Sequence, residues 1–195
     1  MSLHTFSSKA TEPIEFGGDP ALATARLTTT AAPLTAAQID ALIAICDTSI
    51  DAADRAQHGR DWWPLSLSWS LNNEVPQIPS VVCRPRSTEQ VSQLLAYCNS
   101  QGIAVTPSGG RSGVCGSSIP LQAGVALDMT LMQGIESIDE ISGIVETLSG
   151  TFGPDLERAV RTHGLTIGHY PQSFDIATVG GWVACQIGRA SCRER

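Results

Sequence analysis

The sequence is short of basic residues and has no long apolar run. Lys and Arg total 12 against 19 Asp and Glu, which gives a formal net charge of −7. Such an acidic chain disfavours nucleic acid or an anionic membrane surface as a partner. No apolar run approaches the length of a transmembrane helix, so no membrane span is expected. Residues 1–13 also lack the apolar centre of a secretory signal, and the expected location is therefore the cytoplasm.

The sequence also lacks the cysteine patterns that bind metals or build disulfide frameworks. It has no CxxC pair and no Cys/His cluster with zinc spacing. No metal site is therefore predicted. Five of the six cysteines are expected to be reduced and mostly buried thiols: Cys46, Cys83, Cys98, Cys115 and Cys185.

The sixth cysteine, Cys192, lies in an unusual C-terminal string. The last nine residues, IGRASCRER, resemble the translation of a sequencing adapter, and a CAG codon for Gln186 fits the adapter's leading bases. On this interpretation the native chain stops at Cys185, in mid-domain, and residues 186–195 are excluded from fold reasoning. The chain is then a C-terminally truncated fragment. The alternative is a genuine basic tail.

The composition, 42% hydrophobic and 16% charged, is typical of a globular protein with a core. Residues 1–33 are rich in Thr, Ala, Ser and Pro and predict an irregular arm. Residues 34–78 predict a helical segment, with one helix from a Thr35 cap through about Arg55. Three tryptophans follow, which predict packing of a helix onto a core, with a ligand platform as the alternative: Trp62, Trp63 and Trp69.

From residue 79 onward, short strands alternate with helices, which predicts an α+β domain over 79–185. Ser87 and Gln90 form a capping-box pattern at the start of one helix, and Gly153 and Pro154 open another. The expected strands are 80–83, 103–106, 124–129 and 165–168, with a strand pair at 138–141 and 143–148.

The first candidate site is the string PSGGRSGVCG, residues 107–116. Four glycines in so short a stretch are costly in chain entropy unless the backbone needs positive φ or close approach to a ligand. Successive N–H groups there can converge on an anion such as pyrophosphate. The spacing matches neither GxGxxG nor GxxxxGK[ST], so neither a Rossmann nor a P-loop site is predicted. A tight structural turn is the alternative.

The second candidate is GHYPQSFDIATVGGWVAC, residues 168–185. The paired Gly180 and Gly181 again suggest close backbone approach. His169 is a candidate base or hydrogen-bond donor, although a lone histidine is more often structural. Asp175 is expected to be a hydrogen-bonding loop residue, because no second carboxylate accompanies it.

The two glycine segments, about 60 residues apart and preceded by a strand–helix–strand unit, together resemble one family. They are similar to the FAD-binding domain of the vanillyl-alcohol oxidase (PCMH-type) family. GHYPQSFDIATVGGWVA resembles most the alkyldihydroxyacetonephosphate synthase branch. The resemblance covers about residues 55–185. It implies an N-terminal helical segment and an incomplete FAD-binding domain, with FAD extended between two α+β subdomains.

By position, the resemblance assigns cofactor contacts to both segments. The third flavin segment begins near Cys185 in the family, and a fourth segment and a cap domain follow. Some relatives attach flavin through a His where Arg111 stands, or through a Cys where Ile176 stands, so non-covalent FAD is expected. The implied cofactor-binding residues are Pro107, Ser108, Gly109, Gly110, Arg111, Ser112, Gly113, Gln172, Ser173, Phe174, Asp175, Ile176, Ala177, Thr178, Gly180 and Gly181.

The resemblance implies an FAD-dependent oxidoreductase acting on a small hydroxy acid or alcohol. An ether-lipid enzyme like alkyldihydroxyacetonephosphate synthase, with a lipid-precursor substrate, is the alternative within that class. In both, the cofactor carries the difficult chemistry. A cofactor-free scaffold, or a fragment without function, is the alternative of another class. Catalytic residues are expected in the missing cap, so none is assigned, and a homodimer is left open.

Overall fold

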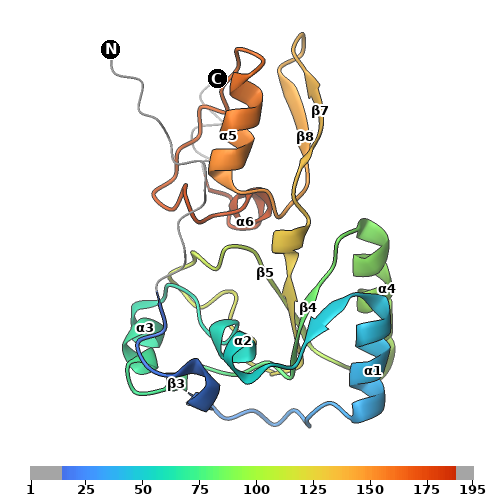
Figure 1. Cartoon of the computed structure of the whole chain (residues 1–195), viewed down its shortest axis with the longest axis vertical. Coiled ribbons are helices and arrows are strands. Elements are labelled where there is room, and N and C mark those ends of the chain that lie inside the picture. The colour runs from blue at the N-terminus through green and yellow to red at the C-terminus, as the bar shows by residue number, and fades with distance from the viewer. Residues whose placement is uncertain (1–14, 188–195) are drawn as a thin grey trace.

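The computed structural model describes residues 15–187, and its ribbon divides into two parts (Figure 1). The first part runs to residue 131 and contains a four-stranded sheet flanked by helices. The second part contains a β-hairpin and two helices. This arrangement confirms the predicted α+β class. Residues 1–14 and 188–195, which include most of the adapter-like string, lie outside the described residues.

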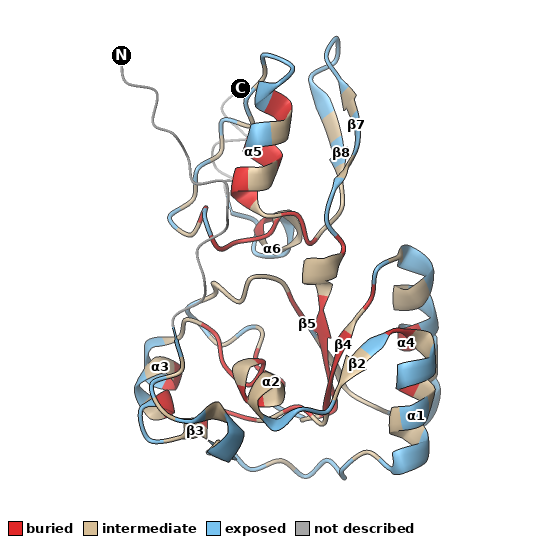
Figure 2. Cartoon of the chain, viewed as in Figure 1, coloured by how far each residue is buried: buried red, intermediate tan, exposed pale blue. Residues whose placement is uncertain are grey.

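The sheet of the first part has the strand order β2-β4-β6-β5. Its strands are β2 (Asp47–Ser49), β4 (Val81–Arg84), β6 (Val125–Asp128) and β5 (Val105–Ser108). β4, β6 and β5 are parallel, and β2 is antiparallel to β4. All four residues of β6 are buried, as expected for a parallel strand covered on both faces (Figure 2). The core around it comprises Leu42, Cys46, Val81, Cys83, Leu94, Cys98, Val125 and Leu127.

The helix α4 (Thr88–Gln101) connects β4 to β5, as predicted. Ser87 Oγ accepts a hydrogen bond from the Gln90 amide at 3.3 Å, and Gly102 ends the helix with φ 64°. The Gln90 side chain accepts from the Arg86 amide rather than from Ser87. One of the two hydrogen bonds of the predicted capping box is therefore present, from the Gln90 amide to Ser87. In the other, the Gln90 side chain accepts from the amide one residue before the cap.

The single helix predicted from Thr35 to Arg55 is wrong. α1 (Ala36–Ile45) ends where Cys46 becomes extended, and residues 47–49 pair with β4 as strand β2. Asp51 then caps α2 (Ala52–Gln57) by accepting from the Asp54 amide at 2.8 Å. Pairing with the edge of β4 overrides the helical spacing, and the segment predicted to be helical contributes a strand to the main sheet.

The rest of the N-terminal region consists of short elements. α3 (Pro64–Ser70) carries Trp69, whose ring lies edge-on to Trp63 with centroids 5.4 Å apart. The strand β3 (Glu74–Val75) pairs with β1 (Thr24–Ala25), which follows the 3₁₀ turn η1 (Pro20–Leu22). Trp63 and Trp69 therefore contact each other at this helix and are half-buried, and neither belongs to the two core clusters of the described residues.

The second part is built on a hairpin and a buried cluster. After the 3₁₀ turn η2 (Met129–Leu131), β7 (Ile135–Asp139) and β8 (Ile144–Thr147) form the predicted strand pair. α5 (Gly153–Arg161) and α6 (Val179–Ala184) complete this part. Its core comprises Leu156, Val160, Phe174, Ala177 and Trp182.

The strand predicted at 165–168 is absent, because a buried carboxylate takes the place of a partner strand. Glu157 on α5 is 1% exposed and accepts from the Ile167 amide at 3.1 Å. It also accepts from the hydroxyls of Thr166 at 2.8 Å and Tyr170 at 2.7 Å, and from Arg161 at 2.7 Å. Burial by itself would raise the pKa of Glu157, but these donors hold it below its ordinary value.

Cysteines, metal-ligating groups and membrane spans can be assessed only within residues 15–187. There, Cys46, Cys83 and Cys98 are buried and Cys115 and Cys185 are exposed, all as free thiols. No group of three or more His, Cys, Asp or Glu side chains in this range is arranged to hold a metal ion. No helix in this range is both long and apolar enough to cross a bilayer.

Candidate functional site

The first glycine segment lies where three parallel strands end. β4, β5 and β6 end at Arg84, Ser108 and Asp128, and Ser108 is paired with Asp128 in the sheet. Ligands of parallel sheets bind beyond the carboxyl ends of the strands, where loops and polar side chains converge. Residues 109–113 leave the sheet at this edge, so the fold places the loop in a typical ligand-binding position.

The two glycine segments predicted to bind a cofactor lie against each other. A Cβ atom on Gly109 would overlap the Thr178 hydroxyl, and one on Gly110 would overlap the carbonyl oxygen of Ile176. Neither glycine has positive φ, whereas Arg111 does, at 53°. Close packing of the two segments therefore requires both glycines directly. The expectation that they serve only positive φ or ligand approach needs this correction.

The backbone of the first segment is rich in available donors. Within residues 15–187, no amide of residues 109–113 donates a hydrogen bond to another protein group. The Ser108 hydroxyl is buried and also lacks a partner in this range. Unpaired polar groups of this kind are costly unless a ligand or water satisfies them. A row of free N–H groups beside a free hydroxyl fits the pyrophosphate of a dinucleotide.

The second segment serves as the support for the first. Two of its backbone amides donate to carbonyls elsewhere in the second part. Val179 donates to Thr151 at 2.9 Å, and Gly180 donates to Ser149 at 2.8 Å. Thr178 caps α6 through its hydroxyl. The buried members are Phe174, Ile176, Ala177 and Thr178, while Ser173, Gly180 and Gly181 are half-buried and Gln172 and Asp175 are exposed.

His169 belongs to the packing of the second part. Its ring lies edge-on to Trp182 with centroids 5.1 Å apart. Asp175 is exposed on the loop. Within residues 15–187, the buried His169 Nε2 has no hydrogen-bond partner, and the expectation that Asp175 forms hydrogen bonds in the loop stays a prediction.

A buried polar cluster, which sequence reasoning missed, anchors Arg111. Arg111 Nη1 lies 2.7 Å from His58 Nε2. His58 Nε2 also lies 3.0 Å from Asp128 Oδ2. Arg84 Nε lies 3.2 Å from Asp128 Oδ2, and its two terminal nitrogens bind Asp54 at 3.0 and 2.6 Å. His58 Nδ1 lies 2.8 Å from the carbonyl of Asp54, which only accepts, so Nδ1 carries a proton.

The cluster keeps its carboxylates ionised. Burial alone would raise the pKa of Asp128, but His58 and the Thr130 amide lower it to about 2. Burial opposes ionisation of Asp54 too, yet hydrogen bonds from His58 and Arg84 hold its pKa well below its ordinary value. Burial lowers the pKa of Arg111, which remains a cation at neutral pH. A fixed positive charge therefore stands beside the free amides of the loop.

Comparisons with known proteins identify the family of this chain. A model of the FAD-binding domain family matches residues 79–195. Alkyldihydroxyacetonephosphate synthase of Dictyostelium discoideum is 31% identical over 60% of this chain and 20% of that protein. D-2-hydroxyglutarate dehydrogenase of Danio rerio is 35% identical over 55% of this chain and 19% of that protein. D-lactate dehydrogenase of Anaerostipes hadrus is 36% identical over 56% of this chain and 23% of that protein.

Solved structures show the same fold. A crystal form of alkyldihydroxyacetonephosphate synthase superposes with a TM-score of 0.75 and 23% identity, covering 92% of this chain and 34% of that one. p-Cresol methylhydroxylase superposes with a TM-score of 0.64 and 19% identity, covering 77% of this chain and 30% of that one. The chain belongs to the FAD-binding domain family, and FAD is its cofactor. It spans about a fifth to a quarter of the length of these curated relatives.

Proposed function

We propose that the whole protein is an FAD-dependent oxidoreductase that acts on a small hydroxy acid or alcohol. The observation that carries the proposal is the row of free amides at residues 109–113 beside the free Ser108 hydroxyl. Bound FAD would supply the hydride acceptor. The residues of this chain would hold its phosphates through the first segment, while the second segment fixes the loop from behind. Similarity to D-lactate and D-2-hydroxyglutarate dehydrogenases supports the substrate class.

The second candidate function is that of an ether-lipid enzyme. It is favoured by the superposition on alkyldihydroxyacetonephosphate synthase over 92% of this chain and by 31% identity to the Dictyostelium discoideum enzyme. The two candidates share the cofactor site and differ in the substrate they accept. Incubating the complete flavoprotein with D-lactate and with acyl-dihydroxyacetonephosphate plus a fatty alcohol would separate them.

The proposal includes non-covalent attachment of FAD. The side chains at the two attachment positions of relatives are Arg111 and Ile176, and neither is a nucleophile that forms a stable flavin bond. Acid precipitation of the flavin-loaded protein should therefore release the yellow cofactor into the supernatant. Colour retained in the pellet, or on a denaturing gel, would contradict this part of the proposal.

The cofactor site is tested by titrating the chain with FAD and recording flavin fluorescence. Ser108→Ala should weaken FAD binding about tenfold, the loss of one hydrogen bond to a charged group. Gly110→Val should abolish binding, because its side chain would force the loop away from Ile176. Ser92→Ala, on the exposed face of α4, is the matched control. Wild-type affinity in both site variants would refute the assignment of this loop.

A further inference from the structure

Three buried cysteine side chains share the core of the first part. Cys46 lies at the end of α1, Cys83 lies in β4, and Cys98 lies in α4. All three belong to the same cluster of buried residues. Cysteines that pack together in this way can form a disulfide with each other once one of the sulfurs is oxidised. The cluster is therefore a candidate site of oxidative modification.

Two of these cysteines contact the same hydroxyl group. Thr48 in β2 is paired with Cys83 in β4. Cys46 lies two residues before Thr48 and is extended, so both side chains point to the same face. The Thr48 hydroxyl lies 3.9 Å from the sulfur of Cys46 and 3.4 Å from the sulfur of Cys83. The strand register therefore holds these two sulfurs beside each other.

The two thiols differ in acidity and in access to solvent. Hydrogen bonding from Cys83 lowers the pKa of Cys46 to about 7, although burial acts in the opposite direction. The same interaction, together with burial, raises the pKa of Cys83. Cys46 is 6% exposed, whereas Cys83 is 0% exposed. Because the thiolate is the reactive form, a small oxidant would react first with Cys46, and Cys83 lies behind it.

We propose that Cys46 and Cys83 form a disulfide when the chain meets a peroxide. The Cys46 thiolate attacks one oxygen of hydrogen peroxide, the O–O bond breaks, and the released hydroxide takes up a proton and leaves as water. Cys46 is then a sulfenic acid. The Cys83 sulfur attacks the sulfur of Cys46, the S–O bond breaks, and the departing hydroxide takes the Cys83 proton to form a second water. The inference does not rest on the proposed function.

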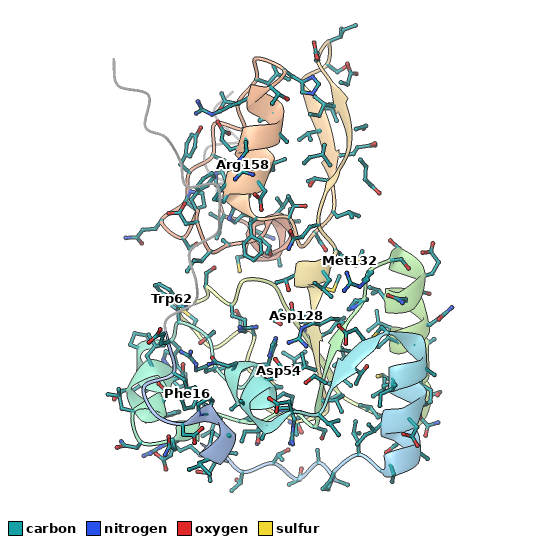
Figure 3. All side chains as sticks on the ribbon, viewed as in Figure 1. Phe16, Asp54, Trp62, Asp128, Met132 and Arg158 are labelled. Atoms are coloured by element: carbon teal, nitrogen blue, oxygen red, sulfur yellow. The ribbon has the colours of Figure 1, made fainter. Side chains whose placement is uncertain are left out.

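This disulfide would fasten the helical N-terminal segment to the main sheet. Cys46 directly precedes the edge strand β2. Cys83 directly precedes Arg84, whose guanidinium binds Asp54 and Asp128 in the middle of the first part (Figure 3). A covalent link would hold β2 against β4 next to these charged groups. Oxidation should therefore slow hydrogen exchange of the β2 amides, which open locally in the reduced chain.

The test is peptide mapping of the full chain after treatment with hydrogen peroxide. A bulky maleimide first blocks exposed thiols such as those of Cys115 and Cys185. Tryptic cleavage at the intervening arginines places Cys46, Cys83 and Cys98 in three different peptides. We expect the Cys46 and Cys83 peptides to be joined, with a mass two hydrogens below their sum. Dithiothreitol should separate them again.

Substitutions separate the roles of the three sulfurs. Cys83→Ser should leave Cys46 as a sulfenic acid that dimedone traps, and Cys98→Ser is the matched control that keeps the disulfide. The mapping of the wild-type chain decides the proposal even if a variant misfolds. Unlinked Cys46 and Cys83 after peroxide treatment, or a link from Cys46 to Cys98, would overturn it. Unchanged exchange of the β2 amides in the linked chain would refute the fastening of this strand.

Discussion

Arg111 illustrates how a single residue links the flavin loop to the first part of the chain. It has φ 53°, a conformation that costs free energy in a residue with a Cβ, and its guanidinium lies 2.7 Å from His58. His58 is in turn held by Asp128 at the end of β6. The strained loop conformation and the buried polar cluster therefore support each other, and the positive charge is fixed before any ligand arrives.

Asp128→Asn should lower the free energy of unfolding by about 2 kcal/mol at pH 7, because it removes a buried, ionised partner of Arg84 and His58. The pKa of Asp128 is lowered in the folded state to about 2. An aspartate in the unfolded chain has a pKa of about 4, so the stabilising contribution of Asp128 is complete above about pH 4. This contribution is lost as the pH falls toward about 2. Urea unfolding of both proteins at several pH values measures this.

The difference between wild type and Asp128→Asn should shrink progressively below pH 4. Asp155→Asn provides the matched control, since Asp155 forms an exposed ion pair with Arg158 whose worth is at most about 1 kcal/mol. A pH-independent difference, or an equal effect of the control, would contradict the role of the buried cluster.

Among the elements, α5 organises the second part by means of one buried carboxylate. Glu157 accepts hydrogen bonds from a segment, 165–170, that has no strand partner. This fixes the start of the second glycine segment, whose later residues pack against the flavin loop. Helical spacing in the sequence predicts α5 well, but nothing in the spacing distinguishes a buried glutamate from an exposed one.

Glu157→Gln should destabilise the protein by about 2–3 kcal/mol, because the neutral amide loses charge-assisted bonds and presents buried donors to Arg161 and Ile167. The change should also make residues 165–171 more sensitive to limited proteolysis. Glu146→Gln, an exposed residue that accepts from Ser137, should change neither measurement appreciably. Equal protease sensitivity of wild type and Glu157→Gln would show that Glu157 does not hold residues 165–170 in place.

At the scale of the whole molecule, the contact between the two glycine segments brings the two parts together. Gly109 and Gly110 lie in the loop that follows β5 in the first part, while Ile176 and Thr178 belong to the second. Ligand groups bound at the loop would therefore stabilise the folded arrangement of both parts. The helical N-terminal segment also contributes, since β2 completes one edge of the sheet and His58 reaches the loop.

FAD at about 100 times its dissociation constant should stabilise the folded chain by about 2.7 kcal/mol through mass action. The corresponding rise in melting temperature, followed by circular dichroism, should exceed that given by riboflavin, which lacks the phosphates. Probes in both parts should shift together. A melting temperature unaffected by FAD at this excess would contradict cofactor binding by the described fold.

The sequence by itself determined the α+β class, the capped helix α4, the hairpin of β7 and β8 and the two glycine segments, since local spacing and turn chemistry specify them. It failed at residues 47–49 and 165–168, where a sheet edge and a buried carboxylate decide the conformation. Only the tertiary structure brought His58 to Asp128, 70 residues apart, and packed Gly110 against Ile176. Such contacts depend on strand order and chain crossing, which local sequence patterns do not encode.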